Sequence, residues 1–282
     1  MKRYFGCHVS AAGGLANAIR NGAALGVNTI QIHPTPPQRW MYKPFQPAAA
    51  AEFLEAKAGS CVEKVFFHGV YLINLATADH TMLGHGMRSL QYYLDLMEAI
   101  GGDGVIFHVG SNKDQESEEA GFRQAADSIN RVLESAKGRS KLLLEVAAGS
   151  GKIIGDKMEE LRAIYEMIDD KARVGFALDS QHMWASGYDL AGRLSDVVRQ
   201  IEKVLTVEKL GAIHLNDSKT ELASRADRHE NLGDGTIGKA ALAGFIKHPK
   251  LTSVPVILET PGMKDLASAA KEVAKLRSMI AG

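Results

Sequence analysis

The sequence predicts an α/β fold, a closed (β/α)8 TIM barrel that forms a single domain over residues 1–282. One observation is an alternation of short β-branched or aromatic runs with longer stretches whose apolar residues recur at helical spacing. Another is length, because 282 residues exceed a typical domain but fit one barrel. No Pro/Gly/Ser-rich linker or shift in composition divides the chain. Strand and helix alternating without a break favour a closed parallel barrel.

Eight short segments are expected to form the barrel strands, because buried parallel strands read as nearly continuous apolar runs. They are residues 4–8, 28–33, 64–68, 104–108, 141–145, 173–179, 211–214 and 255–259. Between the strands, residues 84–102 and 118–138 carry apolar side chains at helical spacing, and each stretch closes on glycine, which favours a helix end. The longest irregular segments are expected after strands two, six and seven, and long loops in a compact domain are commonly functional.

Composition excludes several classes of protein. With 45% hydrophobic and 23% charged residues, the chain is neither disordered nor fibrous. No apolar run is long enough to span a membrane, and the N-terminal residues lack the features of a signal peptide. The 33 basic residues balance 33 acidic ones, so any attraction for nucleic acid must be local. Cys7 and Cys61, without a CxxC spacing, indicate a reducing, cytoplasmic compartment and exclude a thiolate zinc finger.

The last residue of every predicted strand is polar and can bind a metal or a proton. These residues are His8, His33, His68, His108, Glu145, Asp179, His214 and Glu259. In a parallel barrel the carboxyl ends of the strands converge on one face, where active sites lie. A single histidine at a strand end is usually structural. Eight polar strand ends together predict a functional site.

Two loop segments add candidate ligands to the same face. In 179-DSQH-182 an imidazole follows the strand-ending acid, and in 227-DRHENLGDGTIG-238 two candidate ligands stand two residues apart. In an extended segment such residues point the same way, so Asp227 and His229 could bind one ion. The alternative is a solvated turn, because Gly233, Asp234 and Gly235 are ordinary turn residues. The strand ends favour the metal-binding interpretation.

The candidate metal ligands from strand three onward are too many for one ion. They are His68, His108, Glu145, Asp179, His182, His214, Asp227, His229 and Glu259. Because a zinc ion takes about four or five ligands, the set indicates two or three ions. Imidazole and carboxylate without thiolate suit Zn²⁺, Mn²⁺ or Fe²⁺ better than Ca²⁺ or Mg²⁺. Closely spaced metals commonly bind both the attacking and the leaving oxygen of a phosphoryl group, which predicts phosphodiester hydrolysis.

The sequence resembles the endonuclease IV family of zinc-dependent apurinic/apyrimidinic endonucleases over almost the whole chain. The segments that carry the resemblance are 8-HVSAAGGLANAI-19, 71-YLINLA-76, 108-HVGS-111, 179-DSQHMWASGYDL-190, 214-HLNDSK-219, 225-RADRHENLGDGTIG-238 and 258-LETPG-262. The resemblance implies three Zn²⁺ ions, with Mn²⁺ or Fe²⁺ possible at one or more sites. The implied ligand sets are His68, His108 and Glu145; Glu145, Asp179, His214 and Glu259; and His182, Asp227 and His229.

The implied reaction belongs to DNA repair. It cleaves the phosphodiester on the 5′ side of an abasic site in double-stranded DNA, leaving a 3′-hydroxyl and a 5′-deoxyribose phosphate. We assign catalysis to Glu145, Glu259 and His229 among the ligands. His8 lies in a matching segment but outside the ligand set, so we assign it a supporting role. The protein is expected to act as a monomer and without a membrane partner.

The expected DNA contacts are Arg39, Trp40, Tyr71 and Arg228. The chain departs from the family pattern here, because Arg39 directly precedes Trp40 where the family usually has one residue between them. Two further departures are Val146, where asparagine is usual, and Asn112, where a second histidine is common.

A divalent-metal sugar isomerase or epimerase on the same barrel is the alternative function, since such enzymes also line the barrel mouth with Glu, Asp and His. The third ligand set distinguishes the two alternatives, because it has no obvious task in moving a proton on a sugar.

Overall fold

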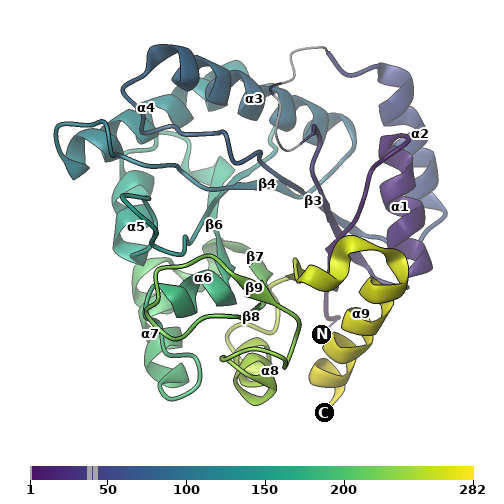
Figure 1. Cartoon of the computed structure of the whole chain (residues 1–282). Coiled ribbons are helices and arrows are strands. Elements are labelled where there is room, and N and C mark those ends of the chain that lie inside the picture. Colours follow the sequence, from purple (N-terminus) through teal and green to yellow (C-terminus); the bar gives the residue numbers. More distant parts are fainter. Residues whose placement is uncertain (1, 37–39, 41–43) are drawn as a thin grey trace.

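The computed structural model describes residues 2–36, 40 and 44–282, and it contains the predicted barrel (Figure 1). Eight parallel strands close in the order β1-β10-β7-β6-β5-β4-β3-β2. Their bounds are β1 (Phe5–His8), β2 (Thr29–Ile32), β3 (Lys64–His68), β4 (Gly104–Phe107), β5 (Leu142–Glu145), β6 (Val174–Asp179), β7 (Leu210–His214) and β10 (Val256–Leu258). Each predicted strand is confirmed to within about one residue at either end.

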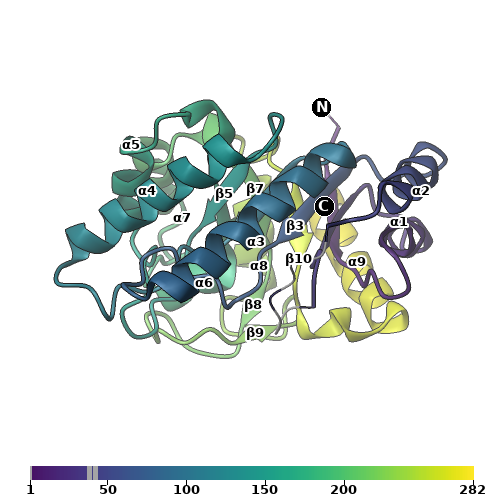
Figure 2. The ribbon, with the colours of Figure 1, turned by 90° about the horizontal axis from the view of Figure 1, so that it is seen from above.

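Helices surround the strands, as two perpendicular views show (Figures 1 and 2). They are α1 (Leu15–Ala24), α2 (Pro47–Ala58), α3 (His80–Ala99), α4 (Glu118–Ser135), α5 (Met158–Glu166), α6 (Ser180–Ala185), α7 (Leu194–Val204), α8 (Lys239–Lys247) and α9 (Leu266–Ala281). Three single turns of 3-10 helix are η1 (Lys171–Arg173), η2 (Val207–Lys209) and η3 (Pro261–Lys264). Within the described part of the chain, no helix combines the length and the hydrophobicity needed to cross a membrane.

Two helix starts differ from the sequence prediction, and a capping aspartate explains each. Helix α3 begins four residues before the predicted 84–102 stretch, because the Asp79 side chain accepts hydrogen bonds from the backbone N–H groups of Thr81 and Met82. The prediction of an irregular segment after strand six was wrong for the first residues that follow the strand. There the Asp179 side chain accepts from the N–H groups of Gln181 and His182, so helix α6 follows β6 directly.

The barrel interior explains why the strand ends face one another. A small apolar cluster inside the strands consists of Phe66, Ile106, Leu143, Ala177, Ala212 and Ile257. Each of these residues stands two positions before a candidate ligand on the same strand. Side chains two apart on a strand share a face, so the strand-ending ligands also point inward, above this apolar layer. The apolar layer therefore forms the floor of the site.

Candidate metal centre

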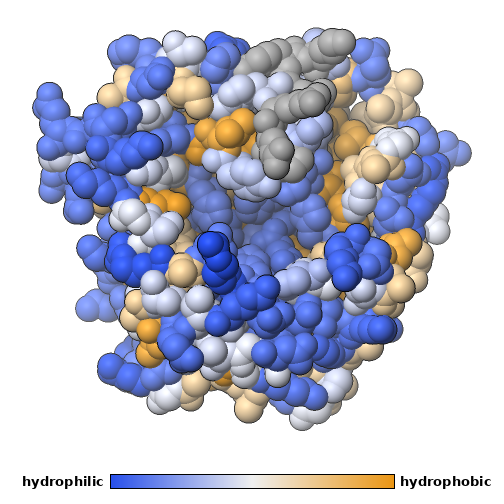
Figure 3. All heavy atoms as spheres, viewed as in Figure 1, coloured by the Kyte–Doolittle hydropathy of each residue, from blue (hydrophilic) through white to orange (hydrophobic). Residues whose placement is uncertain are grey.

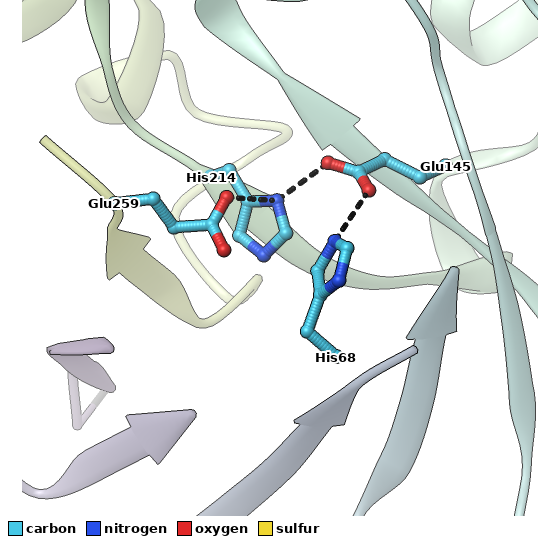
Figure 4. Close-up of side chains that lie close together, drawn as sticks. All are labelled: His68, Glu145, His214 and Glu259. Atoms are coloured by element: carbon cyan, nitrogen blue, oxygen red, sulfur yellow. Dashed lines mark hydrogen bonds and ion pairs between the residues drawn. The ribbon is translucent and has the colours of Figure 1, made fainter. Parts of the chain in front are cut away.

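Glu145 is the centre of the polar cluster at the carboxyl end of the barrel. Its side chain is fully buried, with Oε2 lying 3.1 Å from His68 Nε2 and 3.4 Å from His108 Nε2. Its other oxygen, Oε1, lies 2.6 Å from His214 Nδ1. One carboxylate thus contacts imidazoles from three separate strands or strand ends, and Figure 4 shows those of His68 and His214. Such an arrangement allows Glu145 to bridge two ions.

His214 connects Glu145 to the neighbouring strand ends. Its Nδ1 lies 3.2 Å from Glu259 Oε2 and 3.9 Å from Asp179 Oδ2. The imidazole is fully buried, and Glu259 follows β10 directly (Figure 4). The ligands of the second implied set therefore lie together at the carboxyl ends of β5, β6, β7 and β10.

His182, Asp227 and His229 form a triangle of ligand atoms that matches a zinc site. His182 Nε2 lies 3.4 Å from His229 Nε2 and 3.5 Å from Asp227 Oδ2, and His229 Nε2 lies 3.3 Å from Asp227 Oδ1. Zinc–ligand bonds of about 2.0–2.1 Å in a tetrahedron place neighbouring ligand atoms about 3.3–3.4 Å apart. The two imidazole nitrogens therefore stand at the spacing of neighbouring zinc ligands, and Asp227 faces His182 through Oδ2 and His229 through Oδ1.

Grouping the ligand atoms by distance alone gives overlapping sets. The three groups are His68, Glu145, His214 and Glu259; His108, Glu145 and His182; and Asp179, His182 and His229. These differ in membership from the sets that the family resemblance implies, because Glu145 and His182 each belong to two groups, Asp179 stands with His182 and His229, and Asp227 belongs to none. All nine candidate ligands nevertheless converge at one end of the barrel, as the sequence predicted for residues far apart in the chain.

The charges within the centre hold its carboxylates in the anionic form. Burial would raise the pKa of Glu145, but His108 and His214 hold it well below its usual range. The pKa of Glu259, which burial would also raise, is lowered to about 2 by His214 and His68. Conversely, burial would lower the pKa of His214, but Glu259 and Glu145 raise it to about 9. The carboxylates are thus ready to bind a divalent metal, whereas binding to His214 would displace the proton that its raised pKa retains.

A cleft opens above the centre on the face shown in Figure 3, where the hollowed middle is coloured hydrophilic. Its volume is about 290 Å³, and its lining residues are His8, His33, His68, Tyr71, His108, His182, Asp227, His229, Glu259 and Met263. A second cavity of about 400 Å³ shares Tyr71, His108, His182 and Asp227 with it. The candidate ligands that line this open cleft are His68, His108, His182, Asp227, His229 and Glu259, whereas Glu145, Asp179 and His214 are buried beneath it.

The segment 227–238 is folded onto the barrel by a buried carboxylate. Two short antiparallel strands, β8 (Asp217–Ser218) and β9 (His229–Glu230), pair at the mouth, with His229 opposite Ser218. Asp217 is fully buried and accepts from the backbone N–H groups of Gly233, Ile237 and Gly238 at 3.0–3.2 Å. The chain passes so close here that a Cβ on Gly235 would lie 2.4 Å from the Ser218 carbonyl oxygen. This loop is held by the barrel and differs from a freely solvated turn.

Comparison with known proteins agrees with this geometry. A family of xylose isomerase-like TIM barrels matches residues 19–279. A relative named probable endonuclease 4, from Akkermansia muciniphila, is 36% identical over 274 residues, which cover 97% of this chain and 98% of the relative. The chain belongs to the endonuclease IV family. The resemblance in the sequence is thereby confirmed.

Two solved structures share the fold of this endonuclease IV family member. Endonuclease IV from Thermus thermophilus matches with a TM-score of 0.87 at 29% identity, over 99% of both chains. A D-tagatose 3-epimerase-like protein matches with a TM-score of 0.75 at 16% identity, over 99% of this chain and 97% of the other. The second likeness shows the fold alone. The barrel is therefore common to both functional alternatives, and the sequence relatives separate them.

The expected DNA-contact residues of this endonuclease IV homologue have different surroundings. Tyr71 is 64% exposed at the edge of the cleft. Arg228 is exposed, and its Nη1 donates to the Asp227 carbonyl oxygen at 2.7 Å. Trp40 is half-buried and stacks on His85, with ring centroids 5.4 Å apart. Arg39 lies outside the described residues. Among the described residues of this set, Tyr71 lines the cleft.

The departures from the endonuclease IV pattern fall beside the ligands. Val146 is fully buried directly after Glu145, and its carbonyl oxygen accepts a hydrogen bond from His182 Nδ1 at 3.0 Å. This contact uses the backbone, so it is independent of the side chain at 146 and leaves His182 Nε2 to face Asp227. Asn112 is buried in the loop before α4, outside the three groups of ligand atoms. The hydrogen bond that orients His182 therefore does not require a particular side chain at position 146.

The buried side-chain amides of Asn216 and Gln31 contact the candidate ligands, but neither residue is among those predicted from the sequence. Asn216 Nδ2 donates to Asp179 Oδ2 at 2.7 Å, while its Oδ1 accepts from the Glu259 backbone N–H at 2.9 Å. Gln31 contacts both His214 and Glu259. Their spacing in the sequence could have identified them, because Asn216 stands two residues after His214 and Gln31 stands two residues before His33. Polar residues in register with a strand-ending histidine belong to the same inward face.

Proposed function

We propose that the protein is a metal-dependent, single-domain apurinic/apyrimidinic endonuclease acting as a monomer on double-stranded DNA. It hydrolyses the phosphodiester on the 5′ side of an abasic site and leaves a 3′-hydroxyl and a 5′-deoxyribose phosphate. The observation that carries the proposal is the triangle of His182, Asp227 and His229, with the edges of a zinc site. It stands beside the Glu145 cluster in a chain of the endonuclease IV family.

We propose three ions for the nine side chains, in the sets that the family resemblance implies. His68, His108 and Glu145 would hold the first; Glu145, Asp179, His214 and Glu259 the second; and His182, Asp227 and His229 the third. When bound, such ions make water a stronger acid at neutral pH and place positive charge against phosphoryl oxygens. The site therefore supplies a nucleophile and a charge clamp without a covalent protein intermediate.

The protein's own residues hold this chemistry in place and exclude a thiol nucleophile. Cys7 is fully buried on β1, and burial raises the pKa of its thiol to about 12, so it is neither accessible nor ionised. Cys61 is exposed, but it precedes β3 and so lies at the opposite end of that strand from the candidate ligand His68. Asn216 holds Asp179 and Asp217 holds the segment around Gly233, through the hydrogen bonds described above. Two of the three assigned catalytic residues are strand-end positions: Glu145 is fully buried, and the half-buried Glu259 side chain lies 3.2 Å from His214 Nδ1.

The experiment that tests the proposed function is single-strand cleavage of a duplex with one abasic site. The zinc-loaded protein is expected to cut on the 5′ side of the lesion and to leave a primer terminus that a DNA polymerase extends. An undamaged duplex of the same sequence is the control substrate. Epimerisation of a ketose with no cleavage of the abasic duplex would contradict the proposal and support the alternative function on this barrel.

Purified protein is expected to contain about three transition-metal ions per chain, because the nine ligands divide into three sets around Glu145. Removing the metals with a chelator should abolish cleavage and lower the melting temperature. Free zinc at one hundred times its dissociation constant stabilises a folded site by about 2.7 kcal/mol. Elemental analysis and calorimetry measure both effects. Full activity with one ion per chain would contradict the trinuclear assignment.

Tyr71→Ala is expected to raise KM for an abasic duplex by about tenfold with little change in kcat, because base stacking on an aromatic ring contributes about 1–3 kcal/mol. The ring is the most exposed large hydrophobic side chain among the described residues and borders the cleft. Tyr71→Phe keeps the ring and should behave like the wild type, so it is the matched control. Steady-state kinetics with metal-loaded proteins provide the measurement. Equal KM values for the alanine variant and the wild type would exclude Tyr71 from DNA binding.

A further inference from the structure

Gln31 is a fully buried polar residue in β2, a strand that contributes none of the nine candidate ligands. Its amide lies among residues of three other strand ends. The Oε1 atom lies 2.7 Å from His214 Nε2, and the Nε2 atom donates to Glu259 Oε1 and, at 3.3 Å, to His8 Nδ1. The single amide therefore uses its acceptor and both of its N–H donors within the barrel.

The partners determine how the amide is oriented. The Glu259 carboxylate only accepts hydrogen bonds, so the amide nitrogen of Gln31 must face it. The amide oxygen then faces His214 Nε2, and because a carbonyl oxygen only accepts, His214 carries a proton on that nitrogen. The nitrogen left toward the other ligands is Nδ1, which lies 2.6 Å from Glu145 Oε1 and 3.2 Å from Glu259 Oε2.

We infer that Gln31 is a positioning residue that selects one ligand atom on each of two metal ligands. On His214 it selects Nδ1, because Nε2 is engaged with the amide oxygen. On Glu259 it selects Oε2, because Oε1 is engaged with the amide nitrogen. This inference rests on the proposed metal-binding function of the site. It adds a specific residue, outside the family's ligand set, that prepares the second metal site.

The same amide connects His8 to the centre. His8 Nδ1 accepts the second N–H of Gln31, so the proton of the neutral His8 ring is on Nε2. His8 pairs with Gln31 in the register between β1 and β2, and its ring lines the cleft. His8 therefore contacts Glu259 indirectly, through Gln31, which is consistent with the supporting role that we assigned to it from the sequence.

The test is to remove the hydrogen bonds of Gln31 and measure zinc affinity directly. Gln31→Met fills a similar volume without donor or acceptor, leaving His214 free to change tautomer and Glu259 free to rotate. Gln31→Glu keeps an acceptor for His214 but places a second carboxylate against Glu259. Both variants are expected to bind one zinc ion, that of the second site, about 10- to 100-fold less tightly than the wild type, as is typical when a partner of a metal ligand is removed. Equilibrium competition with a chromophoric chelator measures this affinity.

Kinetics and a matched control separate positioning from a merely structural role. With saturating zinc, kcat for the abasic duplex should fall while KM stays within about threefold of wild type, because ground-state DNA binding does not depend on Gln31. Thr29→Val removes another buried polar group from the same inward face of β2 and should leave zinc affinity unchanged. A structural role would lower the melting temperature of the Gln31 variants without changing the zinc affinity of the folded protein.

Wild-type zinc affinity and kcat in folded Gln31→Met and Gln31→Glu would overturn the inference. If neither variant folds, Gln31→Asn, which keeps the amide but is one methylene shorter, is subjected to the same measurements with the same criterion. A wild-type protein that binds zinc but does not cut abasic DNA would contradict the proposed function. The zinc-affinity test of Gln31 would remain valid in that case, so the two failures are distinguishable.

Discussion

Glu145→Gln is expected to lower kcat for cleavage of an abasic duplex by about 10³-fold or more, by comparison with the removal of a single electrostatic stabiliser from a preorganised site. Glu145 is the carboxylate that contacts imidazoles on both sides, through Oε2 to His68 and through Oε1 to His214. Glutamine replaces one anionic oxygen by an N–H donor, so it cannot bridge two cations. The variant should therefore lose more than one metal ion per chain, which elemental analysis measures.

The matched control for this variant is Glu160→Gln. Glu160 is a carboxylate on α5 whose side chain is only 12% exposed and accepts from the Gly155 backbone N–H, outside the metal cleft. The same chemical change there should leave metal content and kcat unchanged. Retention of all ions and of the wild-type rate in Glu145→Gln would show that this carboxylate does not bridge the sites.

His229→Ala is expected to lower kcat by about 10²-fold or more with a much smaller change in KM, because losing charge stabilisation in the transition state does not weaken ground-state DNA binding. His229 Nε2 lies within 3.5 Å of both His182 Nε2 and an Asp227 carboxylate oxygen. Removing one corner of this triangle should release one ion per chain. Single-turnover cleavage, measured alongside the metal count, determines both effects.

Asp234→Ala is the control within the same loop. Asp234 is exposed and pairs with Lys275 on α9 at 2.9 Å, away from the ligand atoms. A substitution there should change stability by no more than about 0.5 kcal/mol, as surface substitutions usually do. If His229→Ala behaved like this control, with the wild-type rate and all metals bound, residues 227–238 would be an ordinary turn and the third ion would lack its proposed role.

The local sequence was sufficient to predict the eight barrel strands. The eight strands read as apolar runs because both faces of each are buried, and their polar last residues mark the open end of the barrel. Parallel strands in a closed barrel bring those ends together regardless of their separation in the chain. For this reason His68 and Glu259, which are about two thirds of the chain length apart, could be placed in one site without knowledge of any contact.

The short elements at the mouth could not be predicted in the same way. The 3.6-residue period needs more than the six residues of α6 to be recognised, and that helix starts where it does because Asp179 caps it. The two-residue strands β8 and β9 pair across a loop, and their register depends on Asp217 holding the segment around Gly233. Such contacts join residues through space, so no local pattern contains them.

The sequence by itself determined the barrel, the face that carries the site and the identity of the nine candidate ligands. Only the tertiary structure decided which atoms of those ligands face one another. Gln31 illustrates the difference, because in the sequence it is one polar residue in a buried strand, whereas in the folded chain its amide contacts His214 and Glu259 from strands β7 and β10. The physical reason is that strand alternation fixes the direction of a side chain, while its tautomer, rotamer and partners depend on hydrogen bonds across the closed barrel.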